Sequence, residues 1–207
     1  MTTGRKNIIF DLGGVLLNLD IQRTLDAFRQ IGLNNIEELF RIGHASSFFK
    51  QYETGTINNE EFISSVEKFP GNKGSRQQII AAWNAMLLDF PADRVEWLQQ
   101  LKSKYRLFLF SNTNAIHLAR FQQVFTEAHG FNMDELFEVA YYSNLVQLRK
   151  PDAAAYEMVL KQNNLVPAET FFKKSEFERL WYLRLLWKEL YGDTKECYRA
   201  HLYEVDK

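Results

Sequence analysis

The residue whose setting points most directly to chemistry is Asp11, which follows the short apolar run Ile8-Ile9-Phe10. Gly13 and Gly14 come soon after it, and glycines let a small anionic ligand approach the backbone closely. A carboxylate at the tip of a buried strand, ahead of a glycine turn, is held rigidly. This setting predicts a nucleophile or a metal ligand. A capping role at the end of the strand is the structural alternative.

Two further polar segments have the residue types that could complete such a site. Ser111-Asn112-Thr113-Asn114 follows a second apolar run, and Arg149-Lys150-Pro151-Asp152 precedes a predicted helix. Taken singly, the first segment could be an ordinary turn and the lysine of the second could be solvated. Their order along the chain and their places at the ends of elements favour a common site with Asp11.

The composition places the chain among ordinary globular proteins and excludes several classes. The 207 residues are 46% hydrophobic and 14% aromatic, which is enough for one domain with a sizeable core or for a core with an insertion. The formal net charge of −1 gives no sign of a nucleic-acid-binding protein. A single cysteine, Cys197, excludes an internal disulfide and a cysteine metal cluster. We expect a cytoplasmic protein with no membrane span.

The first part of the chain is predicted to be one strand followed by a mostly helical block over residues 17–87. The strand is expected over residues 7–10. An asparagine followed by early acids marks one helix start at Asn58. Helices are expected over 20–31, 36–40, 48–52, from 58 onward, and over 77–87, with a loop at 69–74.

After residue 87 the pattern changes to alternating helices and strands. Helices are expected over 93–102 and 151–163, and strands over 105–110, over 139–142 and from Thr170 onward. Such alternation predicts an α/β fold with a doubly wound parallel sheet. Ligands of these sheets bind beyond the carboxyl ends of the strands, where Asp11 and Ser111 both fall.

The three polar segments together resemble the haloacid dehalogenase (HAD) superfamily of hydrolases. The resemblance covers about residues 7–172 and is strongest to the cap-bearing phosphatase branch, which includes sugar-phosphate phosphatases and the N-terminal domain of soluble epoxide hydrolase. Residues 52–57 and the acidic pair before Phe62 look like the helical cap of that branch. The resemblance implies a HAD-like Rossmannoid core over 1–16 and 88–207, with an inserted cap over 17–87.

The same resemblance implies a role for each site residue. Asp11 would be the nucleophile, Ser111 would donate its hydroxyl to the phosphoryl group, and Lys150 would neutralise charge. The backbone N–H of Asn112 and the turn at Gly14 would contact the substrate. Asp11 and the carbonyl of Gly13 would be ligands of Mg²⁺. Fixed donors around a phosphoryl group suit a transition state that spreads negative charge over its oxygens.

Two departures from the family pattern weaken these implications. Many superfamily phosphatases have a second aspartate two positions after the nucleophile as general acid and base, and this chain has Gly13 there. Asp20 lies too far along to replace it without a fold-back, and His44 and His117 are the other candidates.

The second departure lies after the strand at Thr170, where an acidic pair should complete the magnesium site. The chain instead reads Lys173-Lys174-Ser175-Glu176, and two ammonium groups would repel a divalent cation. The following residues, 176–191, are rich in large apolar side chains with heptad-like spacing, and 200–205 is the one remaining strand candidate. The change suggests a replaced or aberrantly read C-terminus.

The resemblance therefore implies a magnesium-dependent HAD-type phosphatase that acts on a small phosphorylated metabolite. Two alternatives stay open. One is a catalytically silent member that binds an anion, for which the lysines after Phe172 would be suited. The other is a haloacid dehalogenase, in which Asp11 would attack carbon and no magnesium would be needed.

Overall fold

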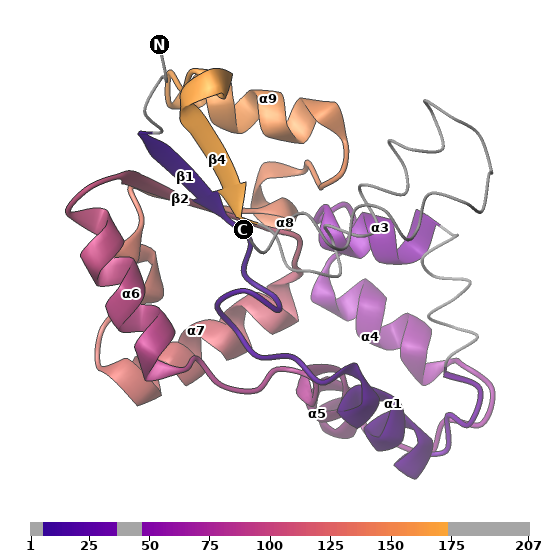
Figure 1. Cartoon of the computed structure of the whole chain (residues 1–207). Helices are drawn as coiled ribbons and strands as arrows, with labels where there is room; N and C mark the ends of the chain where they lie inside the picture. The colour runs from indigo at the N-terminus through magenta and orange to yellow at the C-terminus, as the bar shows by residue number, and fades with distance from the viewer. Residues whose placement is uncertain (1–5, 37–46, 174–207) are drawn as a thin grey trace, which may run out of the picture. The chain divides into compact units, whose positions relative to one another are not determined.

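The computed structural model describes residues 6–36 and 47–173, which contain a four-stranded parallel sheet with helices on both faces (Figure 1). The strands are β1 (Asn7–Phe10), β2 (Arg106–Ser111), β3 (Val139–Tyr142) and β4 (Thr170–Lys173). Their order is β3-β2-β1-β4, and each neighbouring pair is parallel. The chain passes from β1 outward to β3 and then returns to β4 on the other side of β1. The predicted doubly wound α/β sheet is confirmed, and its switch point lies at β1.

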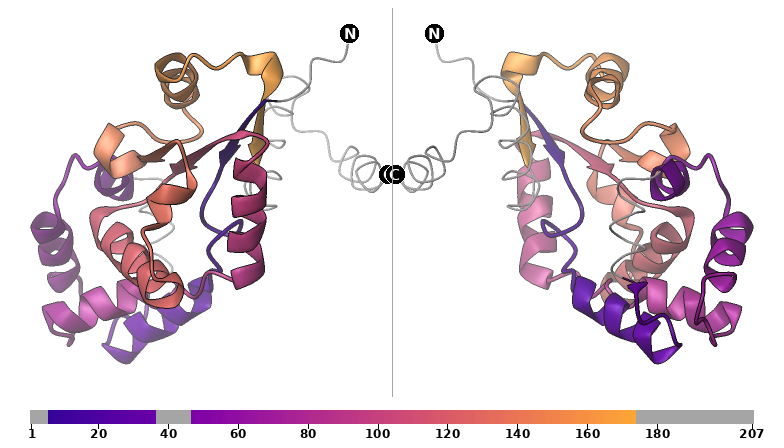
Figure 2. Two further views of the ribbon diagram at one scale, coloured as in Figure 1. Left: turned by 90° about the vertical axis from the view of Figure 1, so that its left-hand side faces the viewer. Right: turned by 90° about the vertical axis from the view of Figure 1, so that its right-hand side faces the viewer.

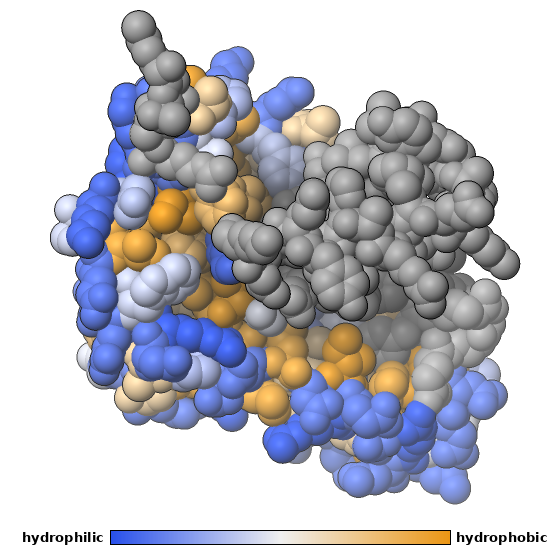
Figure 3. Space-filling view, viewed as in Figure 1, coloured by the Kyte–Doolittle hydropathy of each residue, from blue (hydrophilic) through white to orange (hydrophobic). Residues whose placement is uncertain are grey.

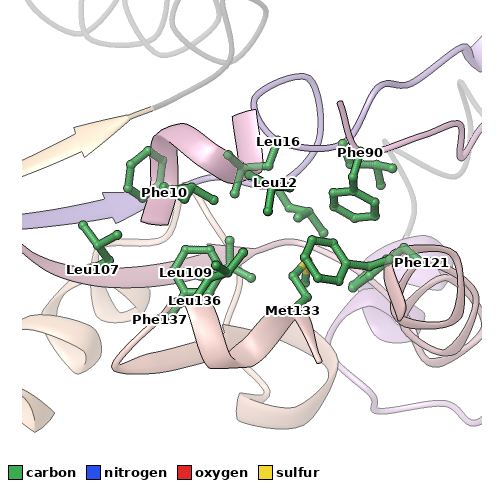
Figure 4. Packing of buried hydrophobic residues seen from close by; sticks show 14 of the residues in the cluster. Phe10, Leu12, Leu16, Phe90, Leu107, Leu109, Phe121, Met133, Leu136 and Phe137 are labelled. Carbon is green, nitrogen blue, oxygen red and sulfur yellow. The ribbon is translucent and has the colours of Figure 1, made fainter. Parts of the chain in front are cut away.

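Alternate residues of the strands enter different cores, as the two-residue period of a strand requires. Leu107 and Leu109 join Phe10 in one core, beneath α6 (Ala92–Lys102) and α7 (Ala115–His129) (Figure 4). Phe108 and Phe110 face the other side, where they pack with α9 (Ala153–Gln162). Burial on both faces explains why β2 reads as a continuous apolar run.

The residues between β1 and α6 form a block of helices around a second apolar core, which also includes Ile116 of α7. Its helices are α1 (Ile21–Gln30), α3 (Ser47–Glu53), α4 (Asn59–Glu67) and α5 (Arg76–Asn84). In both views of Figure 2 they gather at one end of the sheet. Phe28, Phe62 and Trp83 are buried at their centre. Asn58 begins α4 with a capping box, as predicted, and Ser75 begins α5 with another.

The two chain segments that enter and leave this block run side by side. Leu19 and Leu87 form an antiparallel bridge. Asn18 N–H donates to Asp89 O at 2.9 Å, and Leu88 N–H donates to Asn18 O at 3.0 Å. This pairing ends α5 at Asn84, three residues before the predicted end, because the backbone near residue 87 pairs with the incoming segment.

Several elements differ from the sequence predictions. The helix α7 and the short helix α8 (Ser143–Val146) had not been foreseen. Two 3₁₀ turns, Met133–Leu136 and Pro167–Glu169, complete the described elements. Pro151 lies before α9 rather than in its first turn, since Asp152 is the N-cap residue. Of the predicted helix over 36–40, only residue 36 is described. All predictions after residue 173 fall outside the described residues.

No helix in the described part of the chain combines the length and apolar character needed to cross a bilayer. On the face seen in Figure 3, apolar residues form an orange area between polar margins. Large apolar side chains exposed on the described residues are those of Leu19, Ile21, Trp97, Leu145, Val166 and Phe171.

Candidate active site

The centre of the site is an ion pair between Asp11 and Lys150. The Lys150 ammonium lies 2.6 Å from Oδ1 of Asp11. The residues are 5% and 3% exposed, respectively. Buried charges persist in proteins when they are paired and hydrogen-bonded, and each of these groups supplies the partner for the other. The two residues predicted as nucleophile and cation are therefore in direct contact.

A backbone N–H also binds the Asp11 carboxylate. Leu12 N–H donates to Oδ1 at 2.8 Å, so both hydrogen bonds that the described residues make to this carboxylate go to the same oxygen. Asp11 N–H donates to Lys173 O at 2.9 Å, the bond that completes the last β1–β4 pair, Phe10 with Lys173. No hydrogen bond from the described residues reaches Oδ2.

The side chain of Asn112 fixes the backbone of Lys150. Its Nδ2 donates to Lys150 O at 2.8 Å, and its Oδ1 accepts from Lys150 N–H at 2.9 Å. This two-way contact joins the loop after β2 to the segment before α9. The rings of Phe110 and Phe172 lie 5.8 and 5.7 Å from the ammonium, within the range of a cation–π contact. Lys150 is therefore confined on several sides.

Ser111 is the last residue of β2 and is buried. Because Phe10 pairs with Leu109, Ser111 lies one residue beyond the position opposite Asp11, at the same edge of the sheet. Its hydroxyl is 3.4 Å from Asn112 O, a long contact. The next residue but one, Thr113, is held by the buried side chain of Ser143. That hydroxyl accepts from Thr113 N–H at 2.9 Å and lies 3.0 Å from Thr113 O.

The glycine turn after Asp11 contains two different backbone environments. Gly14 has φ of 71°, a conformation that favours glycine, and its N–H donates to Leu17 O at 2.9 Å. Gly13 forms an isolated bridge with Leu17. Asp20 accepts from Gln22 N–H and begins α1 as its N-cap, so its carboxylate is engaged in capping.

The structure argues against His117 as a substitute acid or base. The residue is buried in α7, its Nε2 lies 2.9 Å from Trp83 O, and its ring stacks on the indole of Trp83. Burial lowers the pKa of His117 to about 4. A neutral, packed imidazole of this kind supports the fold. The other histidine candidate, His44, falls outside the described residues.

Sequence reasoning missed the structural roles of Asn114, Trp83 and Ser143. The Asn114 carboxamide oxygen accepts from His117 N–H and from the Trp83 indole, so it both begins α7 and ties α5 to it. An apolar pattern at Ile116, Phe121 and Phe125, followed by a glycine at 130, would have revealed the helix.

A cavity of about 480 Å³ lies between the loop that joins α3 to α4 and the first residues of α7 and α8. Tyr52, Asn59, Ala115 and Asn144 are among the residues that line it. Since α7 and α8 begin soon after β2 and β3 end, the cavity opens at the end of the sheet that holds Asp11. The buried carboxamide oxygen of Asn144 has no hydrogen-bond partner among the residues that the structure describes.

The sequence matches the family of haloacid dehalogenase-like hydrolases over residues 5–172. A HAD family enzyme from Bacteroides thetaiotaomicron, solved with magnesium and inorganic phosphate, superposes with a TM-score of 0.75 at 37% identity. The match covers 82% of this chain and 84% of that one. The chain therefore belongs to the haloacid dehalogenase-like hydrolases.

Two relatives with named activities are phosphatases. A D-ribitol-5-phosphate phosphatase of Bacteroides thetaiotaomicron is 23% identical over 167 residues, which is 81% of each chain. A sesquiterpene phosphatase of Aspergillus oryzae is 26% identical over 181 residues, with 87% of this chain and 85% of the relative covered. These two proteins are named for very different phosphorylated compounds.

Proposed function

We propose that this hydrolase is a magnesium-dependent phosphatase that cleaves a small phosphomonoester through an aspartyl-phosphate on Asp11. The observation that carries the proposal is the buried contact between the Asp11 carboxylate and the Lys150 ammonium at the carboxyl end of β1. The phosphatase relatives support the same chemistry.

The proposed reaction has two displacements at phosphorus. In the first, Oδ2 of Asp11 forms a bond to phosphorus while the bond to the leaving oxygen breaks. In the second, water attacks phosphorus, inorganic phosphate leaves and the carboxylate is restored. The Lys150 ammonium and the Ser111 hydroxyl would stabilise the charge that builds on the equatorial oxygens. With Gly13 in place of a second aspartate, the proton for the leaving oxygen would come from solvent.

Two of the described residues would supply part of a magnesium site. Asp11 would provide one carboxylate and Gly13 one carbonyl, and Mg²⁺ is often held by one or two carboxylates together with waters and the substrate phosphate. Among the described residues no group of three His, Cys, Asp or Glu side chains is gathered for a metal. These two donors would fit a Mg²⁺ ion that takes its other ligands from the bound phosphate and from water. When bound, Mg²⁺ would polarise the phosphoryl oxygens.

We further propose that the helical block over residues 17–87 acts as a cap on a core of residues 1–16 and 88–207. Its apolar core, to which α7 adds Ile116, and the paired segments near Leu19 and Leu87 suit a unit that moves as one body. The cavity lined by Tyr52, Asn59 and Asn144 would then receive the leaving group of a small phosphorylated metabolite.

The test is magnesium-dependent hydrolysis of an aryl phosphate by the purified full chain, beside the variant Asp11→Asn. We expect phosphate release by the parent protein, loss of that release with a metal chelator, and a rate in the variant at least about a thousandfold lower. Equal rates in the two proteins would remove Asp11 from the mechanism.

A non-catalytic anion-binding protein is the second candidate. The observation that favours it is the position of Lys173 next to Asp11, whose N–H donates to the Lys173 carbonyl. The family pattern has an acidic pair near this position, and this chain has lysines there. Binding of inorganic phosphate without turnover would support this candidate over the phosphatase. Release of halide from a 2-haloacid without magnesium would instead favour a dehalogenase.

A further inference from the structure

One helix of the proposed cap contacts the turn that contains Lys150. Glu53, the last residue of α3, has its carboxylate 2.8 Å from Nη2 of Arg149. Lys50, one turn earlier in the same helix, lies 3.9 Å from Asp152. Lys50 and Glu53 are three residues apart in α3, and their partners are also three residues apart in the 149–152 turn. The helix and the turn therefore meet along matching faces.

The two ion pairs differ in burial, and this difference identifies the important one. The side chains of Arg149 and Glu53 are 23% and 24% exposed, whereas those of Lys50 and Asp152 are 56% and 50% exposed. Solvent screens the outer pair strongly and the inner pair much less. The Glu53–Arg149 contact is therefore the one that can hold the turn.

The loop after α3 fixes how closely the two segments approach. Gly55 has φ of 66°, and a Cβ atom at this residue would lie 2.2 Å from the carbonyl oxygen of Asn144. Only a glycine lets the backbone pass this near. The end of α3 is thus packed tightly against the segment that leads into the 149–152 turn.

Arg149 transmits this contact to Lys150, which follows it directly. Asp152 N–H donates to Arg149 O at 3.0 Å and closes the turn. From the sheet side the turn is held by Asn112, and from the helical block it is held through Arg149. Within the described residues the buried Nε–H of Arg149 has no hydrogen-bond partner, whereas its Nη2 contacts Glu53.

We propose that Glu53 is a positioning residue that, through Arg149, keeps the Lys150 ammonium against Asp11. As a role in catalysis this rests on the proposed phosphatase function. The geometric part, the hold on Lys150, is independent of any activity. A displacement of about 1 Å in a catalytic group can cost as much as a hundredfold in rate, so a modest loosening of this turn should be measurable.

The experiment compares Glu53→Gln and Arg149→Met with the matched outer-pair control Lys50→Gln, all in the full chain. Lysine acetylation followed by peptide mass spectrometry measures the accessibility of Lys150, with the exposed Lys161 as internal reference. We expect Lys150 labelling to rise about threefold or more in the first two variants and to stay at the parent level in Lys50→Gln. Circular dichroism melts confirm that each variant is folded.

The same variants are assayed on an aryl phosphate with magnesium. We expect kcat to fall roughly tenfold in Glu53→Gln with KM changed less than about twofold, and Glu53→Asp to recover part of the loss. Unchanged labelling and unchanged kcat in a folded Glu53→Gln protein would overturn the proposal. If the parent protein shows no turnover, the phosphatase assignment fails. The labelling result alone then supports or overturns the hold of Glu53 on Lys150.

Discussion

The Lys150 ammonium and the Asp11 carboxylate are 139 positions apart in the sequence and 2.6 Å apart in the structure. Two parallel strand pairings, β1 with β2 and β1 with β4, bring the ends of these three strands to one edge of the sheet. The turn before α9 then crosses this edge and carries the lysine to the tip of β1. The contact is therefore a product of the sheet topology as a whole.

The first prediction concerns the energy of this buried pair. Lys150→Met leaves the carboxylate of Asp11 buried without its cation, and we expect the free energy of unfolding at pH 7 to fall by about 3–5 kcal/mol. The double variant Lys150→Met/Asp11→Asn removes both charges, so it should recover about half of that loss. Urea denaturation measures both changes. Equal stabilities for the single and double variants would contradict a strongly coupled pair.

The second prediction concerns the glycine that stands in place of a second aspartate. Gly13 has no left-handed φ. The nearest described atom to an added Cβ would be Cδ1 of Leu19 at 2.8 Å, in a flexible and partly exposed side chain. If the chain is a phosphatase, Gly13→Asp/Leu19→Ala should raise kcat at least about tenfold, because general acid catalysis contributes 10²–10⁴-fold where it operates.

The control for this prediction is Leu19→Ala alone, which makes room without adding a carboxylate and should leave kcat near the parent value. A new acidic limb in the pH–rate profile of the double variant would identify the added group as the source of the gain. No gain in a folded double variant would count against a step limited by protonation of the leaving oxygen.

The sequence predicted the sheet and the polar segments well because both depend on local patterns. Buried parallel strands read as apolar runs, and polar residues at their ends are visible without coordinates. The contact between Asp11 and Lys150 followed from the family resemblance rather than from spacing. The two-way clamp by Asn112 and the capping role of Asn114 had no such signature, because each depends on a partner that only the folded chain brings near.

The third prediction tests the close packing at Gly55. Gly55→Ala places a methyl group 2.2 Å from a backbone oxygen, at a φ of 66°, so neither the side chain nor its neighbour can move away cheaply. We expect a loss of about 2 kcal/mol or more in the free energy of unfolding. Gly130→Ala is the matched control, since its φ is 79° but no atom of the described residues lies within 4 Å of the added Cβ. It should cost about 1 kcal/mol.

The last prediction concerns pH and rests on His117. Burial lowers its pKa from 6.5 to about 4 in the folded protein, while the unfolded chain keeps the ordinary value. Between these two values the unfolded state binds more protons, so stability rises with pH in this window and is lost as pH falls through it. The contribution is complete above about pH 7, and we expect it to fall by about 2 kcal/mol between pH 7.5 and 5.

Urea denaturation of the parent and of His117→Asn at both pH values isolates this contribution, because the variant lacks the titrating ring. The same pH dependence in both proteins would show that protonation of His117 does not govern acid sensitivity, and that the contact with Trp83 O tolerates a charged imidazole.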